Sequence, residues 1–298
     1  MLNRIMGRKV SIVSHKVQTT RTRLRAVKMV NYSPPEGGAE LHSNSGGGHP
    51  VQLIFVDTPG IFRPARRLDR AMVGAAMDAT NDADAILLLV DATKGITQTV
   101  RDLAEKIRNQ KSEIKNLFVA INKSDAVRKQ DLLPIAAKLA ELAPFREIFM
   151  ISAVKNDGIE KMLQSLAAVM PAGPYLFDPA DASDVPDKLY LAELTREKIY
   201  KYVHQELPYH IYVATEKVDV DPEGVLEIYQ KIVVRSEAHK KIVVGKGGAQ
   251  LKQIGTAARH DIQDQWGVNA RLHLFVRVEP DWEEKRENYE EQGLEFKK

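Results

Sequence analysis

Four residues that follow a short apolar run have the chemistry to hold a metal ion and a phosphate group. The run 51–56 is rich in Val, Ile, Leu and Phe, and Asp57-Thr58-Pro59-Gly60 follows it directly. A carboxylate at the C-terminal end of a buried strand can hold Mg²⁺ through water, and a glycine lets a backbone N–H approach a phosphate closely. These residue types also form ordinary tight turns, which is the favoured interpretation when the motif is taken alone.

A second polar group, Asn122-Lys123-Ser124-Asp125, follows the apolar run 117–121. An aspartate there can accept both N–H donors on the edge of guanine, whereas adenine presents an acceptor and is rejected. The lysine stem can lie along the base plane, and the asparagine can brace neighbouring loops. Ser152-Ala153 follows the apolar run 148–151, and its backbone can approach the same base. A capped turn remains the alternative for N-K-x-D alone.

A glycine-rich loop in the last third of the chain is suited to contact with a nucleic-acid backbone. Gly245-Lys246-Gly247-Gly248 interrupts a predicted helical hairpin over about 238–265. Glycines let the loop press close to that backbone, and the lysine adds a charge where a phosphate would pass. Four further basic residues can extend the positive strip: Lys240, Lys241, Lys252 and Arg259. An ordinary glycine-rich helix connection is the alternative interpretation.

The elements that carry the first two groups alternate in type along residues 51–170. Apolar runs of four to six residues, typical of fully buried strands, stand at 51–56, 85–90, 117–121 and 148–151. Amphipathic stretches typical of helices stand at about 66–81, 98–110, 130–142 and 157–169. The pattern predicts an α/β domain with a parallel sheet. Since the C-terminal ends of parallel strands meet at one edge, the polar groups are expected to lie together there.

A change of composition marks a boundary after this domain, which we place at 1–170. Residues 171–187 hold four prolines and are predicted to form a linker of restricted flexibility. Residues 188–280 predict a smaller α+β domain, and residues 281–298 an acidic C-terminal tail. The expected elements of the smaller domain are a helix near 190–206, strands near 210–219 and 227–235, the helical hairpin, and a strand over 271–278. The segment 33–50, rich in Gly, Ser and Pro, is predicted to be a flexible insertion between two strands.

Composition excludes several classes of protein. The chain has 298 residues, of which 44% are hydrophobic and 28% charged, as in folded soluble proteins. Its apolar runs are far shorter than the roughly 18 residues that cross a bilayer. With no cysteine there is no disulfide, thiolate metal site or thiol nucleophile, and the eight histidines lack the spacing of a zinc site. The net charge is only +3, but basic residues concentrate in 1–32 and 231–277.

Taken together, these motifs resemble the Era GTPases of ribosome assembly. Besides the groups above, the resemblance rests on three stretches: Gly7-Arg8-Lys9-Val10-Ser11-Ile12, Gln18-Thr19-Thr20-Arg21 and, after Gly60, Ile61-Phe62. In the second domain it rests on the stretch from His239 to Gly248, which matches the G-x-x-G loop of a KH domain. It covers nearly the whole chain apart from 33–50.

The resemblance implies a P-loop NTPase-like α/β GTPase domain followed by an α+β type II KH domain. It implies GTP, GDP and Mg²⁺ as ligands, with Thr20 and Asp57 on the metal ion and Gly60 near the γ-phosphate. Asn122, Lys123 and Asp125 would select guanine. The implied function is a GTP-dependent switch that binds small-subunit (16S-type) rRNA and assists assembly of the 30S ribosomal subunit. Ile61 stands where other GTPases carry a water-orienting glutamine, so no catalytic residue is assigned.

The phosphate-binding string G-x-x-x-x-G-K-S/T does not occur in the sequence. In the family that loop immediately precedes a helix that resembles residues 2–7. We therefore expect the sequence to begin just inside this helix, through a start assigned too far downstream, and to lack the first strand. Each unpaired buried backbone group costs about 1–3 kcal/mol, so the first domain is expected to fold poorly. A nonhydrolytic KH RNA-binding protein with a degenerate GTPase domain is the alternative function.

The expected partners are small-subunit rRNA and the 30S subunit, and we expect a cytoplasmic monomer. Peripheral association with a membrane, through a helix in the basic residues 1–32, is a less favoured candidate. The β-branched residues in 10–12 and 19–22 interrupt a continuous apolar face there. A position at the inner membrane or in an organelle is the alternative location.

Overall fold

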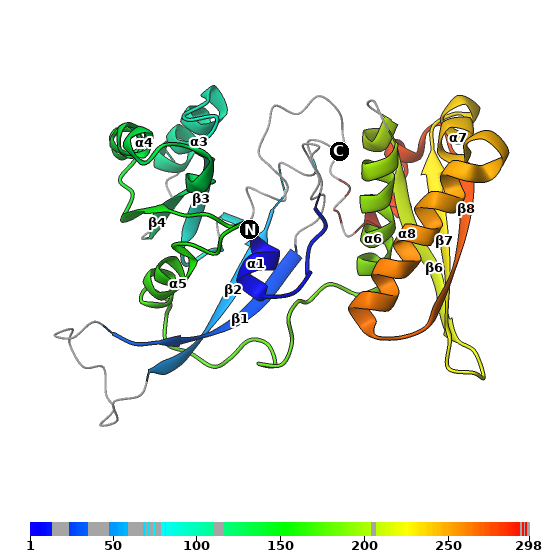
Figure 1. Cartoon of the computed structure of the whole chain (residues 1–298), viewed down its shortest axis with the longest axis horizontal. Helices are drawn as coiled ribbons and strands as arrows, with labels where there is room; N and C mark the ends of the chain where they lie inside the picture. Colours follow the sequence, from blue (N-terminus) through cyan, green and yellow to red (C-terminus); the bar gives the residue numbers. More distant parts are fainter. Residues whose placement is uncertain are drawn as a thin grey trace. The chain divides into compact units, whose positions relative to one another are not determined.

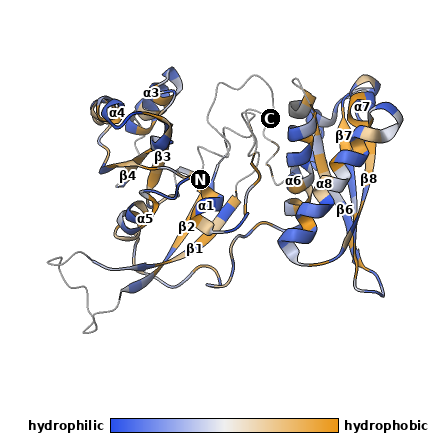
Figure 2. Cartoon of the chain, in the orientation of Figure 1, coloured by the Kyte–Doolittle hydropathy of each residue, from blue (hydrophilic) through white to orange (hydrophobic). Residues whose placement is uncertain are grey.

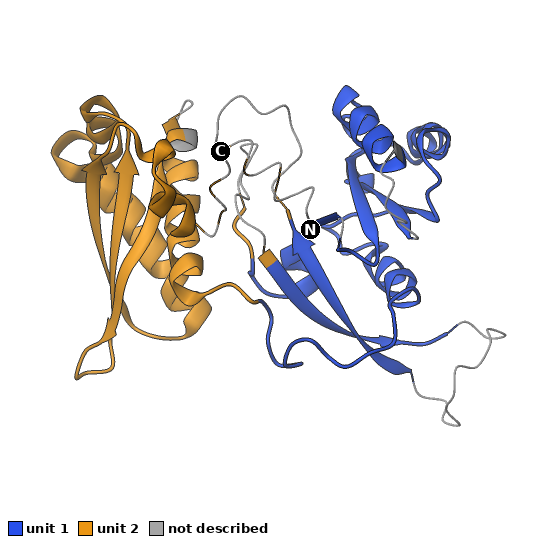
Figure 3. Cartoon of the chain, turned by 180° about the vertical axis from the view of Figure 1, so that it is seen from behind, with its two compact units in different colours: residues 1–10, 25–57, 77–183 blue, residues 11–24, 58–76, 184–298 orange. Residues whose placement is uncertain are grey.

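The computed structural model divides the chain into two compact units (Figure 3). Unit 1 contains residues 1–10, 25–57 and 77–183, and unit 2 contains residues 11–24, 58–76 and 184–298. The structure describes residues 1–13, 24–34, 48–58, 82–109, 116–203 and 207–292, and residues 68, 71, 74, 79, 80, 294 and 296. The predicted site residues Thr20, Pro59 and Gly60 lie outside the described residues, as do 35–47 of the predicted insertion and most of the predicted helix 66–81.

Unit 1 contains two sheets (Figure 1). Strands β1 (Leu24–Tyr32) and β2 (His49–Asp57) pair with each other. Strands β3 (Ile86–Asp91), β4 (Leu117–Asn122) and β5 (Glu147–Met150) form a parallel sheet in that order, which confirms the prediction for three of the four apolar runs. The fourth run, 51–56, lies in β2 and pairs with β1 rather than with this sheet. Among the described residues, no strand pairs with both β2 and β3. The weak folding expected of this domain stays a prediction.

The prediction that all four apolar runs are fully buried is wrong for three of them. Strand β4 lies between two neighbours, and five of its six residues are buried. Strand β2 has a single buried residue, Leu53, and β3 exposes Leu89. Strand β5 also has a single buried residue, Phe149. The physical reason is position in the sheet, because each of these three strands has one paired neighbour among the described residues.

Helices cover both faces of the central strand β4, because side chains alternate along a strand. Phe118 and Ala120 pack in one cluster with helices α1 (Leu2–Met6) and α5 (Ile159–Ala167). Val119 and Ile121 pack in another with α4 (Lys129–Leu142), while α3 (Gln98–Asn109) completes the unit. Figure 2 shows the apolar character of the strands between these helices. The helices predicted at 98–110, 130–142 and 157–169 are confirmed.

The proline-rich linker is held against the β1–β2 pair. Gln52 donates through Nε2 to the Phe177 carbonyl at 2.9 Å, and its Oε1 atom accepts from the backbone N–H groups of Leu176 and Phe177. Further along, the Val27 N–H donates to the Ala182 carbonyl at 2.9 Å. These bonds explain how a segment without helix or strand keeps a defined path.

Residues 187–278 of unit 2 have helices and strands in the order helix, strand, strand, helix, helix, strand. The elements are α6 (Asp187–Tyr202), β6 (Tyr212–Val220), β7 (Leu226–Val234), α7 (Glu237–Val244), α8 (Ala249–Trp266) and β8 (Ala270–Val278). Strand β7 is central, antiparallel to β6 and parallel to β8. Side chains of α6, α8 and the sheet share two buried clusters. The α+β unit and the helical hairpin predicted from the sequence are confirmed.

The described part of the predicted acidic tail is folded into unit 2. It contains a 3₁₀ helix, η4 (Trp282–Glu284), and a short helix, α9 (Arg286–Glu290). Trp282 is 0% exposed, donates through Nε1 to the His210 carbonyl at 3.2 Å, and packs against the Tyr212 ring. The buried apolar residues of this tail, which charge counting overlooks, fasten it to the sheet.

The basic N-terminal residues do not form one long helix. Helix α1 ends at Met6, and residues 24–32 form strand β1. The membrane-surface helix considered for residues 1–32 is therefore wrong, since residues 24–32, with the β-branched Val27 and Val30, form a strand. In the part of the chain that the structure describes, no helix has the length and apolar character needed to cross a membrane.

Candidate nucleotide and nucleic-acid sites

The loops after β4 and β5 are joined at one edge of the parallel sheet by Asn122. Its Oδ1 atom accepts from the Lys123 N–H at 2.8 Å and from the Ala153 N–H at 3.1 Å. The Ser124 N–H also donates to the Ile151 carbonyl at 3.1 Å. The sequence placed N-K-x-D and S-A at neighbouring strand ends, and the structure brings them into direct contact, with the asparagine as the brace.

Asp125 presents an ionised carboxylate at this edge. It lies in the exposed 3₁₀ helix η1 (Ser124–Ala126). A hydrogen bond from the Ser152 side chain is the main cause that lowers the pKa of Asp125 below its ordinary value. Ser152 is itself 1% exposed, and its Oγ atom accepts from the Lys155 N–H at 3.1 Å. An exposed carboxylate oriented in this way suits a ligand with two neighbouring N–H donors, as guanine has.

Lys123 reaches a residue that the sequence analysis missed. Its backbone has the left-handed φ of 64°, and its Nζ atom lies 2.8 Å from Oδ2 of Asp91 at the end of β3. The signal for Asp91 was present, because it too is a carboxylate directly after an apolar run. It was overlooked because it carries no recognisable motif.

Asp57 is the one described member of the two predicted Mg²⁺ ligands. It is half-buried at the end of β2, and Thr58 follows it. Within the described ranges, no three His, Asp or Glu side chains gather to hold a metal ion. Mg²⁺ binds one or two protein carboxylates and otherwise keeps water or phosphate oxygens. A single carboxylate at a strand end therefore fits this ion.

The glycine loop of unit 2 joins α7 to α8 and contains three glycines with positive φ angles. The φ angles are 73° at Gly245, 58° at Gly247 and 80° at Gly248. A Cβ atom at Gly247 or Gly248 would meet nothing within 4 Å. Packing does not require glycine at these two positions. They leave an open stretch of backbone with Lys246 exposed between Gly245 and Gly247.

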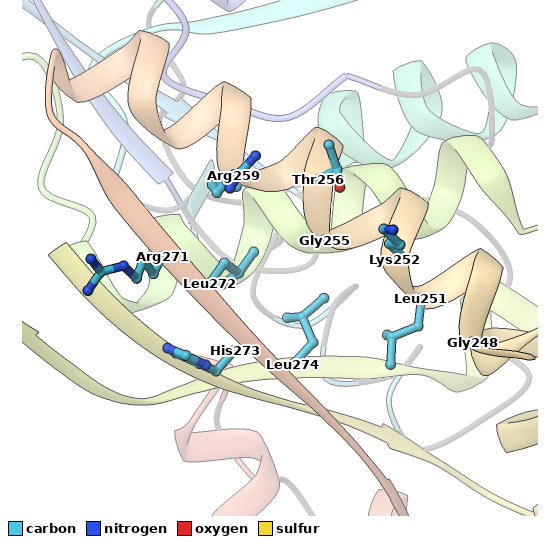
Figure 4. A pocket seen from close by; sticks show the side chains of 10 residues that line it. All are labelled: Gly248, Leu251, Lys252, Gly255, Thr256, Arg259, Arg271, Leu272, His273 and Leu274. Atoms are coloured by element: carbon cyan, nitrogen blue, oxygen red, sulfur yellow. The ribbon is translucent and has the colours of Figure 1, made fainter. Parts of the chain in front are cut away.

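A groove of about 450 Å³ runs from this loop between α8 and β8 (Figure 4). Residues spaced three or four apart on α8 form one side, and β8 forms the other. The lining residues are Gly248, Leu251, Lys252, Gly255, Thr256, Arg259, Arg271, Leu272, His273 and Leu274. At Gly255 a Cβ atom would lie 3.3 Å from Leu274, so this glycine lets helix and strand approach closely.

The sequence analysis identified part of this groove. Gly248, Lys252 and Arg259 line it, whereas Lys240 and Lys241 lie on α7 and are not among the lining residues. The whole contribution of β8 was missed, because an edge strand of ordinary composition shows no signal in its sequence. Helical spacing could have identified Gly255 and Thr256, which lie on the same face as Lys252 and Arg259.

Gly245 has a structural role, which predicts a loss of stability on substitution. A Cβ atom there would lie 2.6 Å from Cβ of Gln250, whose side chain donates to the Tyr202 carbonyl at 3.0 Å. With φ 73° and ψ 175°, the backbone is one that only glycine adopts readily. We expect Gly245→Ala to lower the free energy of unfolding by about 1–3 kcal/mol, measured by urea denaturation.

Gly224→Ala is the matched control for this prediction. Gly224 also has a positive φ, of 80°, but a Cβ atom there would meet nothing within 4 Å. The loss should therefore be smaller than at Gly245. Equal losses at the two positions would show that the contact with Gln250 contributes nothing.

Fold and sites define a two-unit protein with an α/β nucleotide-binding unit and a KH-type nucleic-acid-binding unit. Comparisons with known proteins agree. A family model described as 50S ribosome-binding GTPase matches residues 1–123, and a KH domain model matches residues 198–283. GTPase Era of Afipia carboxidovorans is 42% identical over 298 residues, covering 100% of this chain and 90% of the relative. GTPase Era of Erythrobacter litoralis is 40% identical over 296 residues, covering 99% and 92%. The chain belongs to the Era family of GTPases.

Two solved structures are similar to the whole chain. Era in complex with MgGDPNP and nucleotides 1506–1542 of 16S ribosomal RNA has a TM-score of 0.85 at 32% identity, covering 98% of this chain and 92% of that chain. Aquifex aeolicus Era bound to GDP and AlF4⁻ has a TM-score of 0.84 at 32% identity, covering 98% and 93%. The predicted family and fold class, a P-loop NTPase-like domain followed by a type II KH domain, are confirmed.

Proposed function

We propose that this chain is a GTPase that binds GTP or GDP with Mg²⁺ through its GTPase domain and small-subunit rRNA through its KH domain, and assists 30S assembly in the cytoplasm. The observation that carries the nucleotide half is the exposed, ionised Asp125 carboxylate, oriented by Ser152 beside Asn122 and Lys123. Asp125 selects guanine, the Lys123 stem lies along the base, and Asn122 holds the two loops together. The backbone of Ser152 and Ala153 closes the base site.

Asp57 holds Mg²⁺ in this proposal, with Thr20 as the second protein ligand. The bound ion neutralises charge on the phosphate oxygens when nucleotide is present. Thr58, Pro59 and Gly60 follow the carboxylate, and the backbone N–H of Gly60 meets the terminal phosphate. Gly60 and Thr20 thus make the site sensitive to the presence of the γ-phosphate.

The RNA half rests on the groove between α8 and β8. Its apolar floor from Leu251, Leu272 and Leu274 suits nucleobases, and its basic rim suits phosphates. The Arg259 Nε atom is buried and has no hydrogen-bond partner within the described part of the chain. A phosphate oxygen would satisfy this donor. Single-stranded rRNA is the proposed ligand, and Lys240 and Lys241 extend its path beyond the groove.

Titration with a fluorescent GTP analogue in the presence of Mg²⁺ tests the proposal against the nonhydrolytic alternative. Membership of a GTPase family favours the enzyme, while hydrolysis itself is assigned to no residue, since Ile61 replaces the usual glutamine. Micromolar or tighter binding, with measurable phosphate release, supports the proposal. RNA binding without any nucleotide binding would favour the KH protein with a degenerate GTPase domain.

Lys246 contributes to RNA binding through its charge alone. We expect Lys246→Ala to weaken binding of a single-stranded rRNA oligonucleotide and to reduce the slope of log K against log salt by about 1. Fluorescence anisotropy at several salt concentrations measures both effects. Lys138→Ala, at an exposed position on α4, is the matched control and should leave the slope unchanged. An unchanged slope in Lys246→Ala would remove this lysine from the interface.

A further inference from the structure

Asp91 at the end of β3 makes three interactions that the proposed site does not yet use. Its Oδ1 atom accepts from the Thr93 N–H at 3.0 Å and from the Thr93 hydroxyl at 2.6 Å. Its Oδ2 atom accepts from Lys123 Nζ at 2.8 Å. The carboxylate therefore has one oxygen in its own turn and the other on a residue 32 positions later in the chain.

Backbone hydrogen bonds also hold Asp91 in position. Asp91 is in register with Asn122 in the parallel β3–β4 pair, and the Ala92 N–H continues the pairing to the Asn122 carbonyl at 2.9 Å. The Lys94 and Gly95 N–H groups both donate to the Asp91 carbonyl at 3.0 Å. This carboxylate consequently has a defined position before any ligand arrives.

The electrostatics keep Asp91 charged. Burial alone would raise its pKa, but hydrogen bonds from Lys123 and Thr93 lower it to about 2. The side chain of Asp91 is 23% exposed and that of Lys123 is 53% exposed. Exposed ion pairs contribute little to stability, so an effect on fold stability does not explain this arrangement well. The arrangement is better explained if Asp91 fixes the direction of the long, flexible Lys123 side chain.

We propose that Asp91 is a positioning residue for the nucleobase, holding Lys123 so that its aliphatic stem forms one wall of the guanine site. The inference rests on the proposed function, because it deepens the guanine site. Asp91 does not touch the base. It removes rotamer freedom from Lys123 in advance, which a ligand would otherwise have to remove on binding.

The test is a double-mutant cycle on GDP affinity, measured by fluorescence titration. We expect Asp91→Asn to weaken GDP binding by about 10-fold. If Asp91 acts through Lys123, the double variant Asp91→Asn, Lys123→Met binds GDP no more weakly than Lys123→Met alone. The preference for GDP over IDP, whose base lacks the exocyclic amino group, should stay unchanged in Asp91→Asn because Asp125 still reads that edge.

Asp131→Asn is the matched control, since it removes an exposed ion pair with Arg128 in the same unit and should leave GDP affinity unchanged. Additive losses in the double variant, or wild-type affinity in Asp91→Asn, would overturn the inference. If Asp91→Asn does not fold, Thr93→Val loosens the carboxylate without removing it and must weaken GDP binding in the same direction. A wild-type chain that binds no GDP would instead contradict the proposed function. That result differs both from additive losses and from wild-type affinity in Asp91→Asn.

Discussion

The double variant Gly247→Asp, Gly248→Asp loses RNA binding while the fold persists. Each aspartate adds a carboxylate where the phosphate backbone passes, and repulsion from two charges weakens binding on the order of 100-fold or more. The added side chains also occupy the open stretch of backbone at the mouth of the groove. Anisotropy with a short single-stranded rRNA oligonucleotide measures the loss.

The fold tolerates these substitutions for a local reason. A Cβ atom at either position meets nothing within 4 Å, and aspartate enters the left-handed region more readily than most residues. The double variant Gly7→Asp, Gly95→Asp is the matched control. These glycines also have positive φ, of 70° and 60°, and open space around them, but they lie in unit 1. Unchanged RNA affinity in the Gly247, Gly248 variant would remove the KH interface from the proposal.

Asp125→Asn changes which base is bound. The wild-type carboxylate accepts from two N–H groups of guanine, whereas an amide offers one acceptor and one donor, which matches xanthine. We expect the affinity for GDP to fall by about 100-fold or more, because one hydrogen bond loses its charged acceptor and the other is replaced by a contact between two donors. The affinity for xanthosine diphosphate should rise. Competition titrations with the two nucleotides measure the reversal.

The new ligand serves as the control for this variant, because binding of xanthosine diphosphate shows that the site is still folded. The pKa of Asp125 adds a second readout. Since that pKa lies below the ordinary value, the carboxylate stays ionised, and GDP affinity in the wild type should hold as the pH falls toward about 4. Equal affinities for GDP and xanthosine diphosphate in wild type and variant would disprove the role of Asp125.

The sequence by itself determined the elements and the chemistry at their ends. Strand β4 is a run of apolar residues that ends at Asn122. Such a strand can be predicted from the sequence because its signal lies within a few neighbouring residues. The loop at Gly245 could be recognised in the same way, since positive φ selects glycine at each position separately. The class of protein followed from these motifs in their order along the chain.

Only the tertiary structure decided which residues from different elements share a site. Asp91 meets Lys123 across two strands, β8 completes the groove opposite Arg259, and Trp282 fastens the acidic tail to the sheet. Contacts of this kind depend on strand order, helix packing and burial, which join residues distant in the chain and leave no periodic signal in the sequence.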